Sequence, residues 1–148
     1  MQLCKSSNFG EVEYDDGAVI AFPRGLPGFE SEKQFVPVER EATKPLLFLQ
    51  SVTTPELCFI TIPVQSVDPE YRLRISEEDL TLLGAASGTT ESLRCLAVVC
   101  TAEDRVTANM LGPVVINLET RQGVQAIRDD ARYSVWHPLF PATGVREC

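Results

Sequence analysis

The sequence is poor in the residues that most catalytic and metal sites require. His137 is its one histidine, whereas a hydrolytic triad usually needs a histidine base close to its nucleophile. A tetrahedral zinc site commonly takes four Cys or His ligands at close paired spacings, and the chain has no Cys-x-x-Cys pair. Glycine-rich phosphate-binding patterns are also absent. We therefore expect no catalytic residues, no metal site and no cofactor.

Long apolar runs and a secretory leader are missing as well. No apolar stretch approaches the roughly 20 residues that a membrane-spanning helix needs. The first five residues lack the basic-then-apolar order of a signal peptide. These absences predict a cytoplasmic protein that does not associate with a membrane.

The five cysteines cannot form a fully paired disulfide framework within one chain, because their number is odd. Cys58, Cys95 and Cys100 stand inside apolar runs. A thiol in that context more often serves as a small core side chain than as a reactive group. We expect all three to lie in the core.

Positive charge is scarce relative to negative charge. Lys and Arg number 13 and Asp and Glu number 21, so the formal net charge is −8. An acidic surface repels phosphate backbones, which makes direct nucleic-acid binding unexpected. It attracts a basic protein partner at long range, mainly as a gain in association rate.

What the chain does contain is a series of short apolar runs bounded by Gly, Pro, Asp or Asn, which is typical of buried strands. These runs are residues 18–22, 46–49, 58–62, 93–100 and 114–116. Residues 93–100 form the longest run and predict the central strand. Residues 72–75 alternate between charged and apolar side chains, as in a half-buried strand. Pro37 interrupts another strand-like run and predicts an edge or a bulge there.

Helix signals are few. Ser76 followed by three acidic residues resembles a capping box, and Gly84 would end that helix. A second short helix or turn is predicted near residues 125–131. The pattern as a whole predicts an all-β, compact single-domain, β-barrel-like fold with one or two short helices. We expect the domain to cover residues 1–140 and residues 141–148 to form a frayed tail.

Two segments are more specific than this background. In residues 25–30, Pro27 and Gly28 fit the second and third positions of a type II turn. Such a turn could place Leu26 or Phe29 in the core, or hold them outward beside Glu30 as contact anchors. The other segment, residues 106–117, predicts two strands and a tight connection.

The polar residues beside the apolar runs of residues 106–117 are Asn109 and Asn117. Short amide side chains in such places commonly bond local backbone groups. We expect both asparagines to have this structural role.

In their order along the chain, these segments resemble the flagellar assembly factor FliW family. The resemblance rests on residues 25–30 (Gly-Leu-Pro-Gly-Phe-Glu), 49–51, 59–63, 71–84, 107–117, 123–125 and 133–140. It spans nearly the whole chain. Departures occur at Ala108, Met110 and Gly112, where the family typically has Val, Leu and Ala. These replacements suggest altered packing and a changed affinity for partners.

The resemblance implies a compact β-barrel-like protein that switches between protein partners. Members of the family bind newly made flagellin in the cytoplasm and also bind the translational repressor CsrA. Binding to CsrA relieves repression of flagellin messenger RNA, and accumulating flagellin takes the FliW protein away again. We expect the same two partners here and a monomer when neither is bound.

Six residues are candidates for partner contact. An RNA-binding protein such as CsrA should be basic where it binds RNA, so acidic Glu77, Glu78 and Asp79 are candidates for recruiting it. The residues of the 25–30 turn that could anchor a partner are Leu26, Phe29 and Glu30. Two alternatives remain open: a small-ligand β-barrel or an enzyme with an unrecognised carboxylate site, and a structural subunit of a larger assembly. The former predicts a deep enclosed pocket, and the latter predicts self-association.

Overall fold

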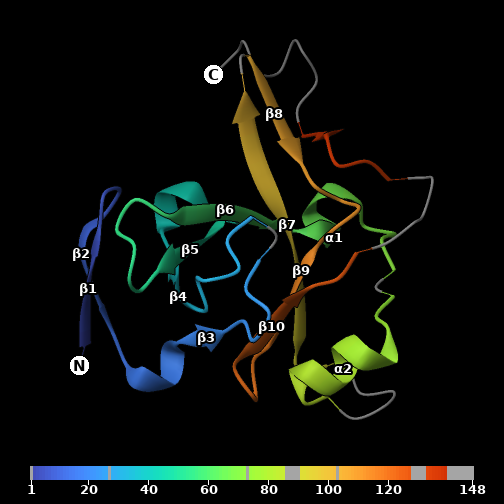
Figure 1. Ribbon diagram of the computed structural model, residues 1–148. Coiled ribbons are helices and arrows are strands. Elements are labelled where there is room, and N and C mark those ends of the chain that lie inside the picture. Colours follow the sequence, from blue (N-terminus) through green and yellow to red (C-terminus); the bar gives the residue numbers. More distant parts are fainter. Residues whose placement is uncertain are drawn as a thin grey trace.

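Seven strands close into a barrel in the computed structural model, which describes residues 2–26, 28–72, 74–85, 91–102, 104–127 and 133–139 (Figure 1). Neighbouring strands pair in the order β7-β6-β5-β4-β3-β10-β9, and β9 pairs back with β7 to close the ring. The seven are β3 (Ile20–Ala21), β4 (Gln34–Glu39), β5 (Leu47–Ser51), β6 (Cys58–Pro63), β7 (Leu93–Ala102), β9 (Val114–Asn117) and β10 (Gln122–Gln125). The predicted β-barrel fold is confirmed.

The remaining elements lie around this barrel. Two strands form a separate antiparallel hairpin, β1 (Gln2–Ser6) and β2 (Gly10–Tyr14). Two more extend the sheet beyond β7, namely β8 (Arg105–Ala108) and β11 (His137–Pro138). The helical pieces are η1 (Asp16–Ala18), η2 (Glu41–Thr43), α1 (Val64–Val67) and α2 (Glu77–Leu83). No helix among the described residues is long and apolar enough to span a membrane.

Most barrel strands are buried on both faces, which explains why they read as continuous apolar runs and not as alternating ones. Within β9, Val114 and Ile116 point into the barrel, where they join a cluster with Phe22, Phe35 and Leu49. Their neighbour Val115 packs outward, under α2. The outward side of β4 is covered in the same way by the β1–β2 hairpin. Side chains thus fill the barrel interior.

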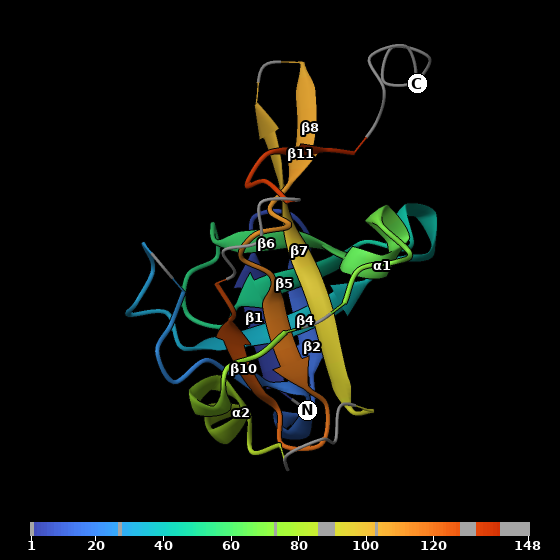
Figure 2. The same ribbon diagram turned by 90° about the vertical axis from the view of Figure 1, so that its right-hand side faces the viewer.

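The strand β7 is central, as predicted. It pairs with β6 on one side, whereas on the other it pairs with β9 near its start and with β8 near its end. Beyond the barrel, β7 and β8 continue as a ribbon that projects from the body of the molecule in both views (Figures 1 and 2). The strand β11 lies along β8. One strand therefore joins the barrel wall to the projecting ribbon.

The predicted helix is confirmed as α2. The Ser76 hydroxyl accepts a hydrogen bond from the backbone N–H of Asp79 at 3.1 Å, as an N-cap should. Gly84 ends the helix with a φ of 70°. Asn117 ties the helix end to the barrel, since its Nδ2 donates to the Leu83 carbonyl at 2.9 Å and its Oδ1 accepts from the backbone N–H of Glu119 at 2.9 Å. The structural role predicted for Asn117 is confirmed.

One local prediction was wrong, and two others fall wholly or largely on residues that the structure does not describe. Arg72, Arg74 and Ile75 belong to no strand, because this segment leads into α2 and packs as a connection, and Leu73 lies outside the described residues. The short helix or turn predicted near residues 125–131 does not begin at Gln125, which ends β10, and residues 128–131 are not described. The predicted tail, residues 141–148, also lies outside the described part of the chain.

Two further predictions need correction in detail. Pro37 lies in an internal strand, but the β3 ladder ends at Phe35, which leaves Pro37 paired on the β5 side alone. Of the cysteines expected in the core, Cys58 and Cys95 are partly buried and Cys100 is exposed, because Cys100 lies where β7 has left the barrel. An apolar run therefore did not ensure burial along its whole length.

Candidate functional site

An apolar hollow of about 330 Å³ opens where the barrel meets the projecting ribbon. We call it the Trp136 groove. Its lining comes from the 25–30 turn, from β6, β7, β9 and β10, and from the segment before β11; the residues are Leu26, Phe59, Val98, Cys100, Asn109, Val114, Gln125, Val135 and Trp136. Segments far apart in the sequence thus converge on one concave surface.

Large apolar side chains are exposed at this groove. Trp136 is 71% exposed and Val135 is 42% exposed. Phe29 is 41% exposed, and its ring packs edge-on against the groove residue Phe59 with a centroid separation of 5.4 Å. An exposed apolar cluster around a concavity is typical of a surface that binds another molecule.

The 25–30 turn forms one wall of the groove and is held by short backbone bonds. The Phe29 N–H donates to the Leu26 carbonyl at 2.7 Å, and Gly28 has a φ of 87°. Both features fit the predicted turn, although Pro27, whose dihedral angles would define its type, lies outside the described residues. The Glu30 carboxylate accepts from the Gly28 N–H at 3.1 Å. Hydrogen bonds from the backbone N–H groups of Glu30 and Gly28 lower the pKa of Glu30.

The turn separates its two candidate anchors. Leu26 is 4% exposed and belongs to the barrel core, so it supports the groove from beneath. Phe29 and Glu30 are exposed. Of the two arrangements left open by the sequence, the core placement holds for Leu26 and the outward placement for Phe29.

Residues 109–113 form a bulge that makes the next wall. Between β8 and β9 the regular pairing with β7 is interrupted, opposite Ala97 and Val98. At this point the Asn109 N–H donates to the Val98 carbonyl at 2.9 Å. The Oδ1 atom of Asn109 accepts from the N–H groups of Leu111 at 3.1 Å and Gly112 at 2.8 Å. The predicted backbone-bonding role of Asn109 is confirmed, and it fixes the shape of the groove at this point.

The three replacements noted in the sequence, Ala108, Met110 and Gly112, lie in or beside this bulge. Ala108 and Met110 are fully buried, and the Gly112 carbonyl accepts from the Gln125 Nε2 at 2.7 Å. The segment that carries Trp136 is fixed on the same bulge, since the Met110 N–H donates to the Ser134 carbonyl at 3.0 Å. Ala108 and Met110 pack in the cluster that contains Tyr71 and Tyr133, so changes at these two positions alter the packing in that cluster.

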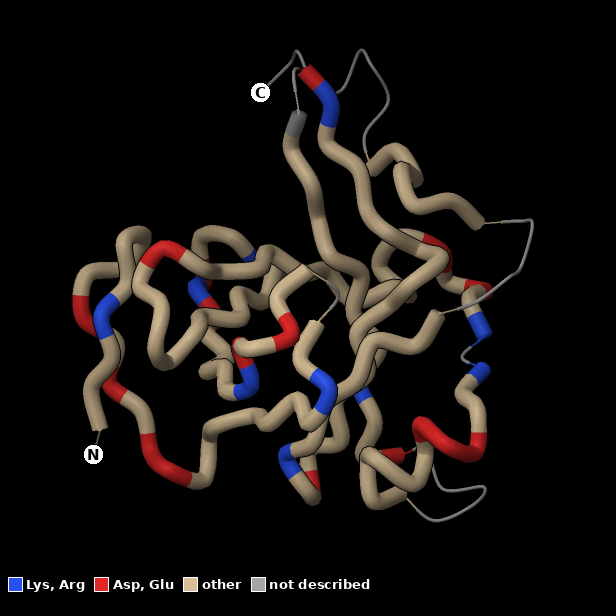
Figure 3. Tube along the Cα trace, viewed as in Figure 1, with Lys and Arg blue, Asp and Glu red and all other residues tan. Residues whose placement is uncertain are grey.

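The acidic residues of α2 differ in their exposure. Glu77 and Glu78 face solvent, whereas the Asp79 side chain is only 13% exposed. Arg24 contacts two of them, with Nη2 2.7 Å from a Glu78 carboxylate oxygen and Nη1 3.0 Å from one of Asp79. Figure 3 shows this acidic segment beside the lower end of the barrel. Sequence reasoning placed all three acids together and gave no sign of their cationic partner.

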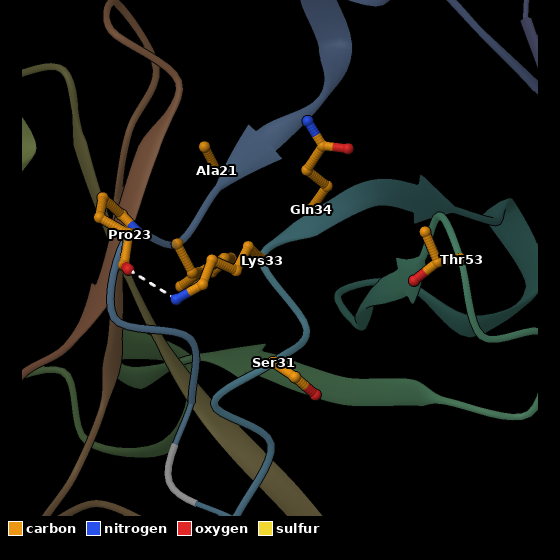
Figure 4. A pocket seen from close by; sticks show the side chains of 7 residues that line it. Ala21, Pro23, Ser31, Lys33, Gln34 and Thr53 are labelled. Carbon is orange, nitrogen blue, oxygen red and sulfur yellow. Dashed lines mark hydrogen bonds between the residues drawn. The ribbon is translucent and has the colours of Figure 1, made fainter.

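A second hollow, of about 320 Å³, lies near the start of β4 (Figure 4). The Lys33 side chain lies in it and donates from Nζ to the Pro23 carbonyl at 2.9 Å. Its lining is more polar, with Ser31, Gln34 and Thr53. It carries no cluster of exposed aromatic side chains comparable with that of the Trp136 groove, so we take the Trp136 groove as the candidate site.

Neither hollow is an enclosed cavity, and the barrel interior between them is packed with side chains. Within the described ranges, no three His, Cys, Asp or Glu side chains gather closely enough to hold a metal ion. The arrangement offers an apolar binding surface with acidic neighbours.

Sequence reasoning missed Trp136, Val135 and Phe59 as groove residues. The one available signal was Trp136, the only tryptophan in the chain, which stands beside the only histidine. It lies in a segment whose partner strand, β8, cannot be identified from local sequence. The convergence of these residues depends on long-range pairing.

Comparisons with known proteins agree on one family. The family model described as FliW protein matches residues 3–139. A flagellar assembly factor FliW from Syntrophomonas wolfei is 33% identical over 144 residues, covering 96% of this chain and 91% of its own length. Another from Geobacillus sp. (strain WCH70) is 36% identical over 132 residues, covering 89% and 91%.

The structural comparison leads to the same family. A crystal structure of the flagellar assembly factor FliW superposes with a TM-score of 0.85 at 34% identity, covering 95% of this chain and 98% of that one. The barrel, the 25–30 turn and the bulge all lie within residues 3–139, the part of the chain that the family model matches. This chain belongs to the FliW family of flagellar assembly factors.

Proposed function

We propose that this protein acts in the cytoplasm by protein–protein contact, as a switch between flagellin and CsrA, and not as a catalyst. By binding CsrA it relieves repression of flagellin messenger RNA, and by binding flagellin it becomes unavailable to CsrA. Membership of the FliW family supports the flagellar part of this proposal. The observation that carries the contact mechanism is the exposed apolar rim of the Trp136 groove.

The groove suits flagellin as an apolar partner segment. Interfaces draw most of their free energy from a few aromatic side chains in desolvated pockets. Trp136 and Phe29 are aromatic, exposed and adjacent to a concavity. A flagellin segment that covered them would remove a large apolar area from water, which favours association.

The acidic face of α2 suits CsrA instead. Glu77 and Glu78 are exposed in the first turn of the helix, and the whole chain carries a net charge of −8. These charges attract the basic surface of an RNA-binding protein and disfavour RNA nearby. Phe29 and Glu30 stand on the groove side, so the two partners would use different parts of the surface.

The filled barrel weighs against the small-ligand alternative. A ligand-binding barrel needs an enclosed cavity with a few convergent polar groups. Here the fully buried Phe22, Phe35 and Leu49 occupy the interior. The contact mechanism requires only the outer surface.

A pull-down with purified flagellin and CsrA, each alone and then in competition, tests the switch. Both should bind, and added flagellin should displace CsrA. Light scattering on the free protein should give the mass of a monomer. If neither protein is retained, the proposed function is wrong.

Charge reversal tests the assignment of α2 to CsrA. The double variant Glu77→Lys/Glu78→Lys should weaken CsrA binding and reduce its dependence on salt. The matched control Glu11→Lys/Glu13→Lys reverses two exposed charges on β2, in the separate hairpin. An equal loss of affinity in both variants would show that only net charge matters, and an unchanged affinity in the α2 variant would remove this helix from the CsrA surface.

A further inference from the structure

Arg24 connects the two surfaces to which different partners have been assigned. It immediately precedes the 25–30 turn, and its guanidinium donates hydrogen bonds to two carboxylates in the first turn of α2. One nitrogen contacts Glu78 and the other contacts Asp79, at 2.7 Å and 3.0 Å. One side chain therefore joins the base of the groove wall to the acidic helix.

The two contacts of Arg24 differ in strength. The Glu78 side chain is 81% exposed, and ion pairs in such a position contribute little because water screens them. The Asp79 side chain is 13% exposed and the Arg24 side chain is 44% exposed, so their contact is partly screened, though less than the contact with Glu78. We therefore infer that Asp79 is the main contact that holds Arg24, and that an incoming cation pairs first with the exposed Glu78 and then competes for the neighbouring Asp79 carboxylate.

The 25–30 turn, which follows Arg24, is packed so closely that a displacement of Arg24 would also displace the residues of the groove wall. Gly25 has a φ of 67°, and the position of a Cβ built on it lies 2.5 Å from the Glu30 carbonyl oxygen. The next residue, Leu26, lines the groove, and Phe29 packs against Phe59. A shift of Arg24 would therefore move Leu26 and Phe29 together.

We propose that Arg24 is a positioning residue that couples the acidic face of α2 to the Trp136 groove. A cationic group of a protein bound at α2 competes for Glu78 and Asp79, releases Arg24 and loosens the 25–30 turn, which weakens binding at the groove. Linkage makes the effect reciprocal, so a segment bound in the groove also weakens binding at α2. This coupling rests on the proposed function for the identity of the two partners, but the link between α2 and the turn can be measured without them.

The first test uses the free protein. Amide hydrogen exchange should become at least about fivefold faster in the 25–30 turn in Arg24→Gln and in Asp79→Asn, which is the lower end of typical coupling. The Phe29 N–H, bonded to the Leu26 carbonyl, is the most direct reporter. The control Arg105→Gln removes the same charge from β8, on the projecting ribbon, and should leave exchange in the turn unchanged.

The second test uses the two partners. In the wild type, saturating CsrA should weaken flagellin binding at least about fivefold, and in Arg24→Gln this factor should fall toward one. Arg24→Lys keeps a positive charge that can pair with Asp79 but loses the forked guanidinium, so its factor should lie between those of the wild type and Arg24→Gln. Arg105→Gln should keep the wild-type factor.

The outcomes separate this proposal from the proposed function. Unchanged exchange in the turn of both Arg24→Gln and Asp79→Asn would overturn the link, whatever the partners do. Faster exchange without binding of either partner would support the link and contradict the proposed function. If both partners bind and their mutual effect survives in Arg24→Gln, the coupling does not run through Arg24.

Discussion

Two glycines in the 25–30 turn offer a matched test of how this wall of the groove is closed. Gly25 and Gly28 both have positive φ, 67° and 87°, so alanine at either position is strained by roughly 1–2 kcal/mol. They differ in their surroundings. A Cβ on Gly25 would lie 2.5 Å from the Glu30 carbonyl oxygen and 2.6 Å from its Cα, whereas among the described residues, chain neighbours aside, no atom lies within 4 Å of one on Gly28.

The steric term therefore falls on Gly25 alone. Because the obstacle is backbone, it cannot rotate away, and forced repacking of this kind costs about 1–3 kcal/mol in addition to the strain. Gly28→Ala should destabilise the turn by roughly 1–2 kcal/mol, as above. Gly25→Ala should destabilise it by about 2–5 kcal/mol in total.

Hydrogen exchange of the Phe29 N–H measures the opening free energy of the turn directly. Urea unfolding shows whether the loss extends to the whole domain. Flagellin binding should fall more in Gly25→Ala than in Gly28→Ala, because only the former displaces Leu26. Equal effects of the two substitutions would refute the inferred contact between Gly25 and Glu30.

Two other predictions concern single hydrogen-bonding side chains. Asn109→Ala removes the acceptor for two backbone N–H groups and should cost about 1–3 kcal/mol in urea unfolding, whereas Asn109→Asp keeps an acceptor and should cost less; equal losses would contradict the role of Oδ1. Hydrogen bonds from the hydroxyls of Ser51, Thr54 and Thr53 lower the pKa of Glu32 below its ordinary 4.5. Its contribution to stability should therefore be complete above that pH and disappear as pH falls through the lower folded value. Glu32→Gln should reduce the loss of unfolding free energy at acid pH, as measured in unfolding curves recorded at several pH values. If the pH dependence of stability is the same in Glu32→Gln, the proposed contribution of the Glu32 carboxylate is wrong.

Local sequence predicted those features that local physics controls. Ser76 and Gly84 bound α2 because capping and chain reversal depend on neighbouring backbone groups. The apolar run that became β7 was recognisable because its barrel half packs on both sides, with Leu96 in one core cluster and Ala97 in another. The Asn109 bonds were predictable for the same reason, since they span only two and three residues.

The site could be predicted only in part, because it depends on contacts between distant segments. Phe29 was recognised as a possible anchor, but its partner Phe59 is brought to it by the closure of the barrel. Trp136 reaches the groove because β11 pairs with β8, a register that no local pattern encodes. Arg24 meets Asp79 across 55 positions of sequence, so the acidic cluster gave no hint of the residue that holds it.

The Trp136 side chain offers the most direct test of the account, because it is exposed in the free protein and central to the proposed flagellin surface. Trp136→Ala should change stability little, since the side chain is 71% exposed. It should weaken flagellin binding at least about 30-fold, which corresponds to the roughly 2 kcal/mol of an interface hot spot. The control Leu3→Ala removes another exposed apolar side chain, 58% exposed, from β1. Calorimetric titration of flagellin into both variants should show the loss in Trp136→Ala alone, and unchanged affinity in a folded Trp136→Ala protein would contradict the groove as the flagellin site.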